Sequence, residues 1–133
     1  MWSRDAATHA LGMVLEHISP GRAVISMSVR ADMTNGHHIC HGGLIFTLAD
    51  SAFAYACNSY NINAVASACH IDFLAPAREG DVLEAQAEER SVTGRTGVYD
   101  ITVRIRGGAT VALFRGKSHR IQGDVLSGLA AAT

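Results

Sequence analysis

The chain has 133 residues and a net charge of −1, and 48% of its residues are hydrophobic. This length fits one domain spanning 1–133, and the near-zero charge offers no basic surface for nucleic acid. No run approaches the roughly 20 apolar residues of a membrane span, and the first residues lack a signal-peptide layout, so we expect a cytoplasmic protein that does not contact membranes. A mean hydropathy of +0.15 is high for so small a domain, which favours association of subunits.

The first third of the chain alternates short elements with turns. Residues 4–12 are predicted to form a helix capped by Ser3. Strands are expected over residues 14–18 and 22–30, separated by a turn at Pro20-Gly21.

A polar loop over residues 31–40 leads into the longest predicted helix, which runs from Gly42 to about Ser59. This helix is apolar nearly all round, so we expect it to be buried on every face.

Four strand candidates follow the long helix. They are expected to form a meander over residues 64–74, 82–90, 98–106 and 110–121, the last two joined by a turn at Gly107-Gly108. One long apolar helix followed by consecutive strands predicts an α+β fold in which one sheet wraps around one helix. The residues from about 124 onward are expected to be a frayed tail.

Asp50 is the only charged residue in the apolar run from Leu44 to Cys57. A carboxylate in apolar surroundings costs free energy unless it is paired, hydrogen-bonded or neutralised. No cation lies three or four residues away on the helix, so a local ion pair does not explain it. Either a distant polar group satisfies Asp50, or it serves as a general base or nucleophile.

The sequence His41-Gly42-Gly43 opens this helix. Free N–H groups and the helix dipole at such a start favour a developing oxyanion, and glycine lets a substrate approach the backbone. A tight turn is the alternative interpretation of this short motif.

Asn35-Gly36, in the preceding loop, is typical of a turn, although the Asn35 amide could also hold a substrate carbonyl or water.

Histidines cluster just before the glycines, at positions 37, 38 and 41. Their spacing precedes the helix and lacks the carboxylate of a zinc motif, so we expect no metal and no cofactor. His41 is interpreted as an orienting or structural residue.

Gly42 and Asp50 are eight residues apart, which places them about 12 Å apart along one helix. A reacting carbonyl must lie within about 3 Å of both its oxyanion donor and its base. One copy of the helix does not easily supply both groups. Two antiparallel copies across a two-fold axis do, so Asp50 of one subunit is expected to face Gly42 of its partner.

Three segments carry a family resemblance: Asn35-Gly36, residues 40–54 and residues 69–81. Together they resemble the hotdog-fold thioesterases, most closely the phenylacetic acid degradation thioesterases of the PaaI type, over roughly residues 8–121. The resemblance implies a curved antiparallel sheet around one central helix. It also implies an acyl-CoA substrate, and homodimers that assemble into a tetramer with active sites at the subunit interface.

The resemblance assigns roles to four residues. Asp50 would activate water or attack the thioester carbonyl, and Gly42 would donate its backbone N–H to the carbonyl oxygen. Asn35 would position the carbonyl or the water, and His41 would support the loop.

Three basic residues and one serine, near two loops, are candidate contacts for the phosphates of CoA, with solvated surface charge as the alternative. They are Arg78 in one group and Arg115, Lys117 and Ser118 in the other.

We therefore expect an acyl-CoA thioesterase that acts on phenylacetyl-CoA or hydroxyphenylacetyl-CoA in phenylacetate degradation. Another hotdog enzyme remains open as an alternative, either a medium-chain or other aryl-CoA thioesterase or a dehydratase. A non-catalytic acyl-CoA binding module and a structural dimerisation domain are also open alternatives. Whether Asp50 is a general base or a nucleophile stays open as well.

Overall fold

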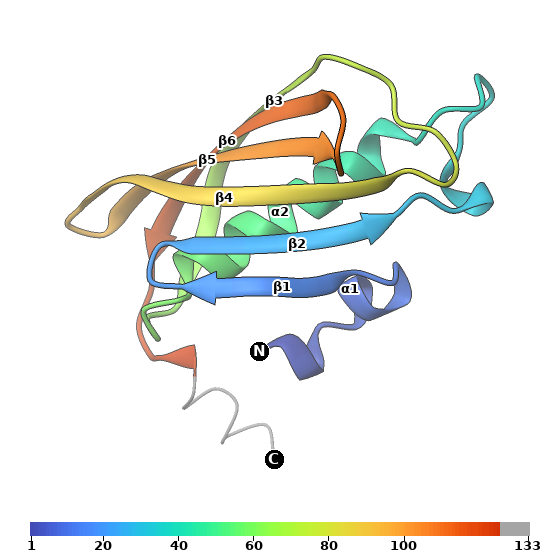
Figure 1. The fold of residues 1–133 in the computed structure, drawn as a ribbon. Coiled ribbons are helices and arrows are strands. Elements are labelled where there is room, and N and C mark those ends of the chain that lie inside the picture. The colour runs from blue at the N-terminus through green and yellow to red at the C-terminus, as the bar shows by residue number, and fades with distance from the viewer. Residues whose placement is uncertain (126–133) are drawn as a thin grey trace.

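One curved antiparallel sheet of six strands wraps around a long helix in the computed structural model, which describes residues 1–125 (Figure 1). The spatial order of the strands is β1-β2-β4-β5-β6-β3. Their bounds are β1 (Val14–Ser19), β2 (Arg22–Ser28), β3 (Ala64–Phe73), β4 (Val82–Thr93), β5 (Thr96–Ile105) and β6 (Thr110–Arg120). This confirms the predicted α+β architecture and the hotdog arrangement that the resemblance implies.

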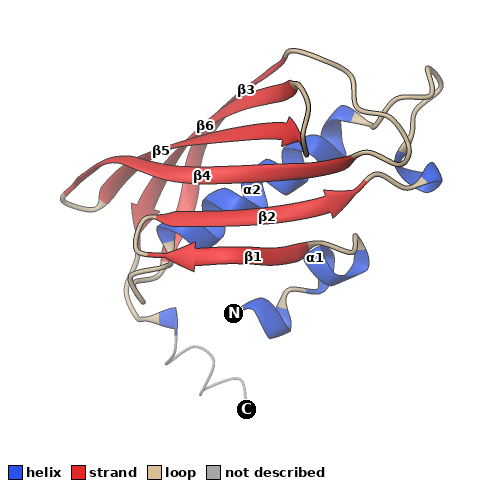
Figure 2. Cartoon of the chain, in the orientation of Figure 1, coloured by secondary structure: helices blue, strands red, loops and turns tan. Residues whose placement is uncertain are grey.

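The long helix α2 (Gly42–Cys57) packs against the inner face of the sheet, mainly on β2, β4 and β5 (Figure 2). Its buried side chains follow helical spacing: Ile45, Leu48, Ala49, Ala52, Phe53, Tyr55, Ala56 and Cys57. The opposite face is only partly covered, and it carries Thr47, Asp50 and Ser51. The expectation that α2 is buried on every face is therefore wrong for the single chain.

The expected four-strand meander is correct for three strands only. β4, β5 and β6 pair in sequence order, but β3 pairs with β6 at the far edge, and β4 pairs with β2. Residues 74–81 carry the chain from that edge back to the middle of the sheet (Figure 1). Alternation of apolar residues predicts which face of a strand is buried, but it does not identify the neighbouring strand.

Two hairpin turns set the length of the central strands. The predicted turn at Gly107, which has a φ of 73°, joins β5 to β6. A second turn at Gly94, with a φ of 61°, joins β4 to β5. It extends these strands to Thr93 and Thr96, beyond the bounds at residues 90 and 98 that the sequence indicated.

The N-terminal segment differs from the predicted helix over residues 4–12. It forms a 3-10 turn, η1 (Trp2–Arg4), and a short helix, α1 (Ala6–Ala10). Asp5, rather than Ser3, caps α1: its carboxylate accepts a hydrogen bond from the Thr8 N–H at 3.2 Å. The same carboxylate accepts the hydroxyl of Tyr55 at 2.9 Å, so a contact with α2 helps decide which residue is the cap.

No helix within residues 1–125 is both long enough and apolar enough to cross a membrane. The expected C-terminal tail lies, from residue 126 onward, outside the described residues.

Candidate active site

The start of α2 leaves one backbone donor unused. His41 is the N-cap, and its Nδ1 accepts the Gly43 N–H at 3.4 Å. The His41 carbonyl accepts the Leu44 N–H at 3.0 Å. The Gly42 N–H meets no acceptor among residues 1–125, so it is free to donate to a ligand at the positive end of the helix.

Backbone hydrogen bonds hold the segment before α2 in place. The His41 N–H donates to the Met33 carbonyl at 2.8 Å, and the Cys40 N–H donates to the Ala77 carbonyl at 2.7 Å. These bonds tie the helix start both to the preceding loop and to the connection between β3 and β4. The free Gly42 N–H is therefore held on a fixed support, as an oxyanion donor requires.

Asn35 shapes the loop and also borders the site. Its Oδ1 accepts the backbone N–H groups of His37 at 2.9 Å and Ile39 at 3.4 Å, which confirms the predicted turn. Because the oxygen is used within the loop, the side-chain NH₂ is the group left to donate to a ligand.

Asn35 and Gly42 line one pocket with a volume of about 460 Å³. The rest of its lining is almost entirely apolar: Ile39, Cys40, Ile45, Phe73, Leu74, Ala75 and Pro76. A Cβ atom at Gly42 would lie 3.2 Å from the ring of Phe73, so glycine gives the pocket its full depth here. The arrangement suits an apolar group attached to a hydrogen-bond acceptor such as a carbonyl.

Asp50 lies two turns further along α2. Burial raises the pKa of its carboxyl above the ordinary value of 3.8. The carboxylate makes no ion pair and no hydrogen bond among residues 1–125. Burial raises the pKa of Cys69 on β3, and the charge of Asp50 raises it further, as expected for a carboxylate on the side of α2 that faces this edge strand.

Asp50 is not among the residues that line the pocket at Gly42. A single chain thus brings Asn35 and Gly42 together and leaves Asp50 about 12 Å away along the helix.

The side chains of His37, His38 and His41 are all exposed. Within the described part of the chain, no three His, Cys, Asp or Glu side chains are grouped so that they could hold a metal ion.

The candidate CoA contacts lie on different surfaces. Arg78 is exposed in the connection between β3 and β4, where its backbone N–H donates to Asp81 at 2.8 Å. Residues 115–118 lie within β6, in agreement with the strand predicted over residues 110–121. Arg115 and Lys117 are exposed on the outer face of that strand. Ser118 points inward and is buried, with its hydroxyl 3.5 Å from the Gly97 carbonyl, so it does not share the exposed surface of Arg115 and Lys117.

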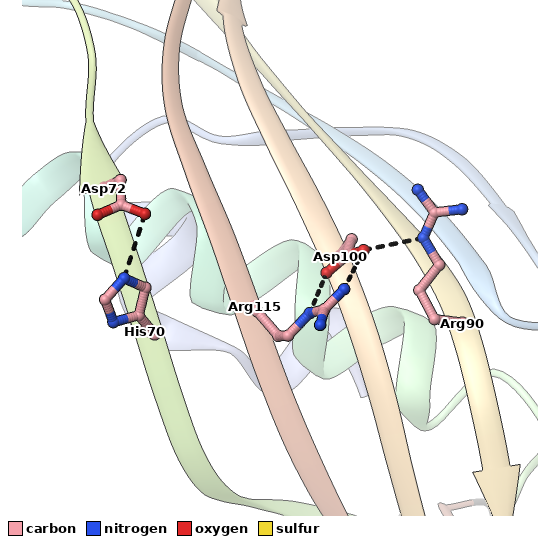
Figure 3. Close-up of polar contacts among 5 residues, drawn as sticks. All are labelled: His70, Asp72, Arg90, Asp100 and Arg115. Atoms are coloured by element: carbon pink, nitrogen blue, oxygen red, sulfur yellow. Dashed lines mark hydrogen bonds and ion pairs between the residues drawn. The ribbon is translucent and has the colours of Figure 1, made fainter.

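Arg115 already has a partner. Its Nε and Nη2 donate to the two carboxylate oxygens of Asp100 at 2.6 and 2.8 Å, and Arg90 donates to the same carboxylate at 2.9 Å (Figure 3). Hydrogen bonding to Arg115 is the main cause that lowers the pKa of Asp100. A CoA phosphate at Arg115 would have to compete with this carboxylate.

Sequence reasoning missed Phe73 and Leu74 as pocket residues. The available signal was two large apolar side chains at the end of a strand, just before Pro76, and both are exposed in the fold. What the pattern did not show is that residues 73–76 lie beside the start of α2.

A hotdog fold with a free donor at the helix start and a half-buried carboxylate on the same helix is suited to chemistry on acyl thioesters. The chain belongs to the thioesterase superfamily, whose family model matches residues 37–112. It is a thioester hydrolase.

Similar proteins match this chain, in sequence or in structure, over most of its length. The acyl-coenzyme A thioesterase PaaI of Escherichia coli K12 is 54% identical over 125 residues, which cover 94% of this chain and 89% of that protein. The structure of E. coli PaaI, from the phenylacetic acid degradation operon, superposes with a TM-score of 0.92 at 55% identity, covering 93% of this chain and 90% of that one. A protein from Thermus thermophilus superposes with a TM-score of 0.85 at 42% identity, covering 89% of this chain and 99% of that one.

Proposed function

We propose that this protein hydrolyses phenylacetyl-CoA, or a ring-hydroxylated relative, to the free acid and CoA in phenylacetate degradation. The observation that carries the proposal is the free N–H of Gly42, a residue that lines a largely apolar pocket of about 460 Å³. The likeness to PaaI supports the acyl-CoA class and the pathway.

The proposed chemistry follows from the groups present. The thioester carbonyl oxygen accepts the Gly42 N–H, and the Asn35 NH₂ lies at the same pocket to hold the carbonyl or the water. Negative charge that develops on this oxygen is stabilised by the N–H and by the positive end of α2. Hydrolysis adds water across the C–S bond: oxygen bonds to the carbonyl carbon, and the CoA sulfur leaves and takes a proton.

Asp50 has two routes in this scheme. As a general base it takes a proton from the attacking water. As a nucleophile it attacks the carbonyl carbon and forms a mixed anhydride, which water then opens. A single turnover in ¹⁸O-water tests the nucleophile route: water that opens the anhydride at the Asp50 carboxyl carbon leaves the label in Asp50, which the base route never labels.

We propose further that each site combines Asp50 of one subunit with Gly42 of the other in a homodimer, and that dimers pair into a tetramer. Two features of β3 support its edge as the contact. Nearly all of its residues are exposed within the single chain, including Val65, and it lies at the edge near Asp50.

The Gly42 N–H is tested by replacing Gly42 with proline and with alanine. Proline is tolerated at the first position of a helix and removes the N–H, and the extended backbone of His41 is compatible with a following proline. Alanine retains the N–H while also pressing on Phe73. We expect Gly42→Pro to lower kcat by about a hundredfold or more relative to Gly42→Ala. Equal kcat in the two variants would contradict the oxyanion role.

Subunit complementation tests the shared site. Asp50→Asn and Gly42→Pro chains are unfolded together and refolded at equal concentrations. A hybrid dimer rebuilds one complete site of two, and random pairing makes about half of the dimers hybrid. The mixture should therefore regain about a quarter of wild-type activity. Activity equal to the mean of the two separate variants would place each site within one chain.

A further inference from the structure

Phe73 is an aromatic side chain left unburied beside the free backbone donor. It is the last residue of β3, and 53% of its surface is exposed. The atoms nearest to a Cβ built at Gly42 all belong to its ring, at 3.2, 3.4 and 3.8 Å. No other side chain among residues 1–125 lies so close to this side of Gly42.

The ring of Phe73 lies on the side of Gly42 that faces the N-terminal end of α2. A Cβ atom in a helix tilts toward the N-terminus, the same direction in which the first N–H groups point. The ring of Phe73 therefore borders the approach to the Gly42 N–H. A carbonyl oxygen that accepts this N–H brings its substituents alongside the ring.

The neighbouring lining leaves the ring as the main aromatic surface available to a ligand. Ile39, Ile45 and Leu74 provide aliphatic walls, and Asn35 provides the polar one. Aromatic rings prefer edge-to-face or offset contacts with other rings, which adds to the gain from burial alone. An aryl acyl group would gain this contact, and a small aliphatic acyl group would not.

Building on the proposed function, we propose that Phe73 is a specificity-determining residue, whose ring contacts the acyl group and favours aryl over short aliphatic thioesters. Such a contact is made in both the ground and the transition state. It therefore acts mainly on KM and leaves kcat nearly unchanged.

The test compares Phe73→Leu and Phe73→Tyr with Leu113→Ala. Leucine keeps an apolar side chain and removes the ring, whereas tyrosine keeps the ring. Leu113 is similarly exposed, at 45%, but lies on the outer face of β6, away from the pocket. For each variant, kcat and KM are measured with phenylacetyl-CoA and with butanoyl-CoA.

We expect Phe73→Leu to lower the preference for phenylacetyl-CoA, expressed as the ratio of the two kcat/KM values, by about fivefold, mostly through KM. Phe73→Tyr and Leu113→Ala should keep this ratio within about twofold of the wild type. An unchanged ratio in Phe73→Leu, or an equal loss for both thioesters, would overturn the assignment while leaving the proposed function intact.

Activity of the wild type separates the failure of the proposed function from the failure of the role of Phe73. If the wild type hydrolyses neither thioester, the proposed function fails. Both thioesters are then stable ligands, and calorimetric Kd values replace kcat/KM. The ratio of the two Kd values must fall in Phe73→Leu and persist in Phe73→Tyr for the assignment of Phe73 to stand.

Discussion

Asp50 has an unpaired carboxylate on a helix whose other side chains are uncharged, and burial raises its pKa. A group tuned in this way is suited to accept a proton or to attack a carbonyl, and it is costly to retain for structure alone. The Gly42 N–H is its counterpart, a donor that no group among residues 1–125 satisfies. The carboxylate is negative and the N–H is the positive end of a dipole, and neither has a partner within the described chain.

At this scale, Asp50→Asn is expected to fold and to lose at least about a hundredfold in kcat with phenylacetyl-CoA, because asparagine can neither take a proton nor attack. Steady-state kinetics measure the loss. Ser51→Ala is the matched control: Ser51 is the next residue on α2, and its hydroxyl only donates to the Thr47 carbonyl. Near-wild-type turnover of Asp50→Asn would refute the catalytic role.

The raised pKa of Asp50 also predicts a pH-dependent stability difference. At pH values between 3.8, the ordinary pKa, and the raised pKa of folded Asp50, the folded protein holds a proton that the unfolded chain has released. The free energy of unfolding therefore falls as pH rises through this window. Asp50→Asn lacks this penalty, so it should be more stable than the wild type at about pH 7, with a smaller difference at about pH 3.5. Urea unfolding at both pH values measures the effect, and an equal difference at both would contradict it.

At the scale of elements, α2 and β6 meet through a glycine. A Cβ atom at Gly116 would lie 2.7 Å from the ring of Phe53, which is buried in the core. The absence of a side chain at this point of β6 allows α2 to lie close to the sheet. This packing sets the position of the helix, and therefore of both Gly42 and Asp50.

Gly116→Ala is accordingly expected to lower the free energy of unfolding by about 1–3 kcal/mol, the usual cost of overpacking a core. Gly36→Ala is the control, because a Cβ there meets no atom within 4 Å. Chemical denaturation compares the two variants with the wild type. Equal stability of Gly116→Ala and Gly36→Ala would mean that α2 adjusts its position freely.

The elements also show how far local sequence patterns reach. Local patterns predicted the long helix and every strand, because the order of apolar, polar and turn residues is a property of each segment by itself. The cap at Asp5 was missed because it also depends on Tyr55, fifty residues away. The place of β3 beside β6 was missed because pairing is chosen by the whole sheet and not by one strand.

For the whole molecule, the two edges of the sheet differ. β1 lies next to the N-terminal helices, whereas β3 is open along nearly its whole length (Figure 1). An open strand of ten residues offers unpaired N–H and C=O groups that favour pairing with another copy. The partly covered face of α2 carries Asp50, whose charge acts on Cys69 of β3, and α2 also contacts this strand.

Val65→Glu on β3 is therefore expected to weaken the proposed dimer and to lower thioesterase activity in parallel, because a buried charge at the proposed contact is unfavourable. Val14→Glu on β1 is the matched control, since the two valines are 47% and 52% exposed and lie on opposite edges. Sedimentation velocity and kinetics over a range of protein concentrations measure both effects. A dimer lost in Val14→Glu and retained in Val65→Glu would place the contact on the other edge.

The sequence by itself determined the helix that carries Asp50, its start at Gly42, the alternation of the strands and the α+β class. These depend on residues within a few positions of one another, and so does the His-Gly-Gly to Leu-Ala-Asp motif that carries the family resemblance. Only the tertiary structure decided that Phe73 lies against Gly42, that Ser118 is buried, and that Asn35 and Gly42 share a pocket that does not include Asp50. These relations join segments far apart in the chain, and they exist only once the sheet has chosen its strand order and α2 has packed on it.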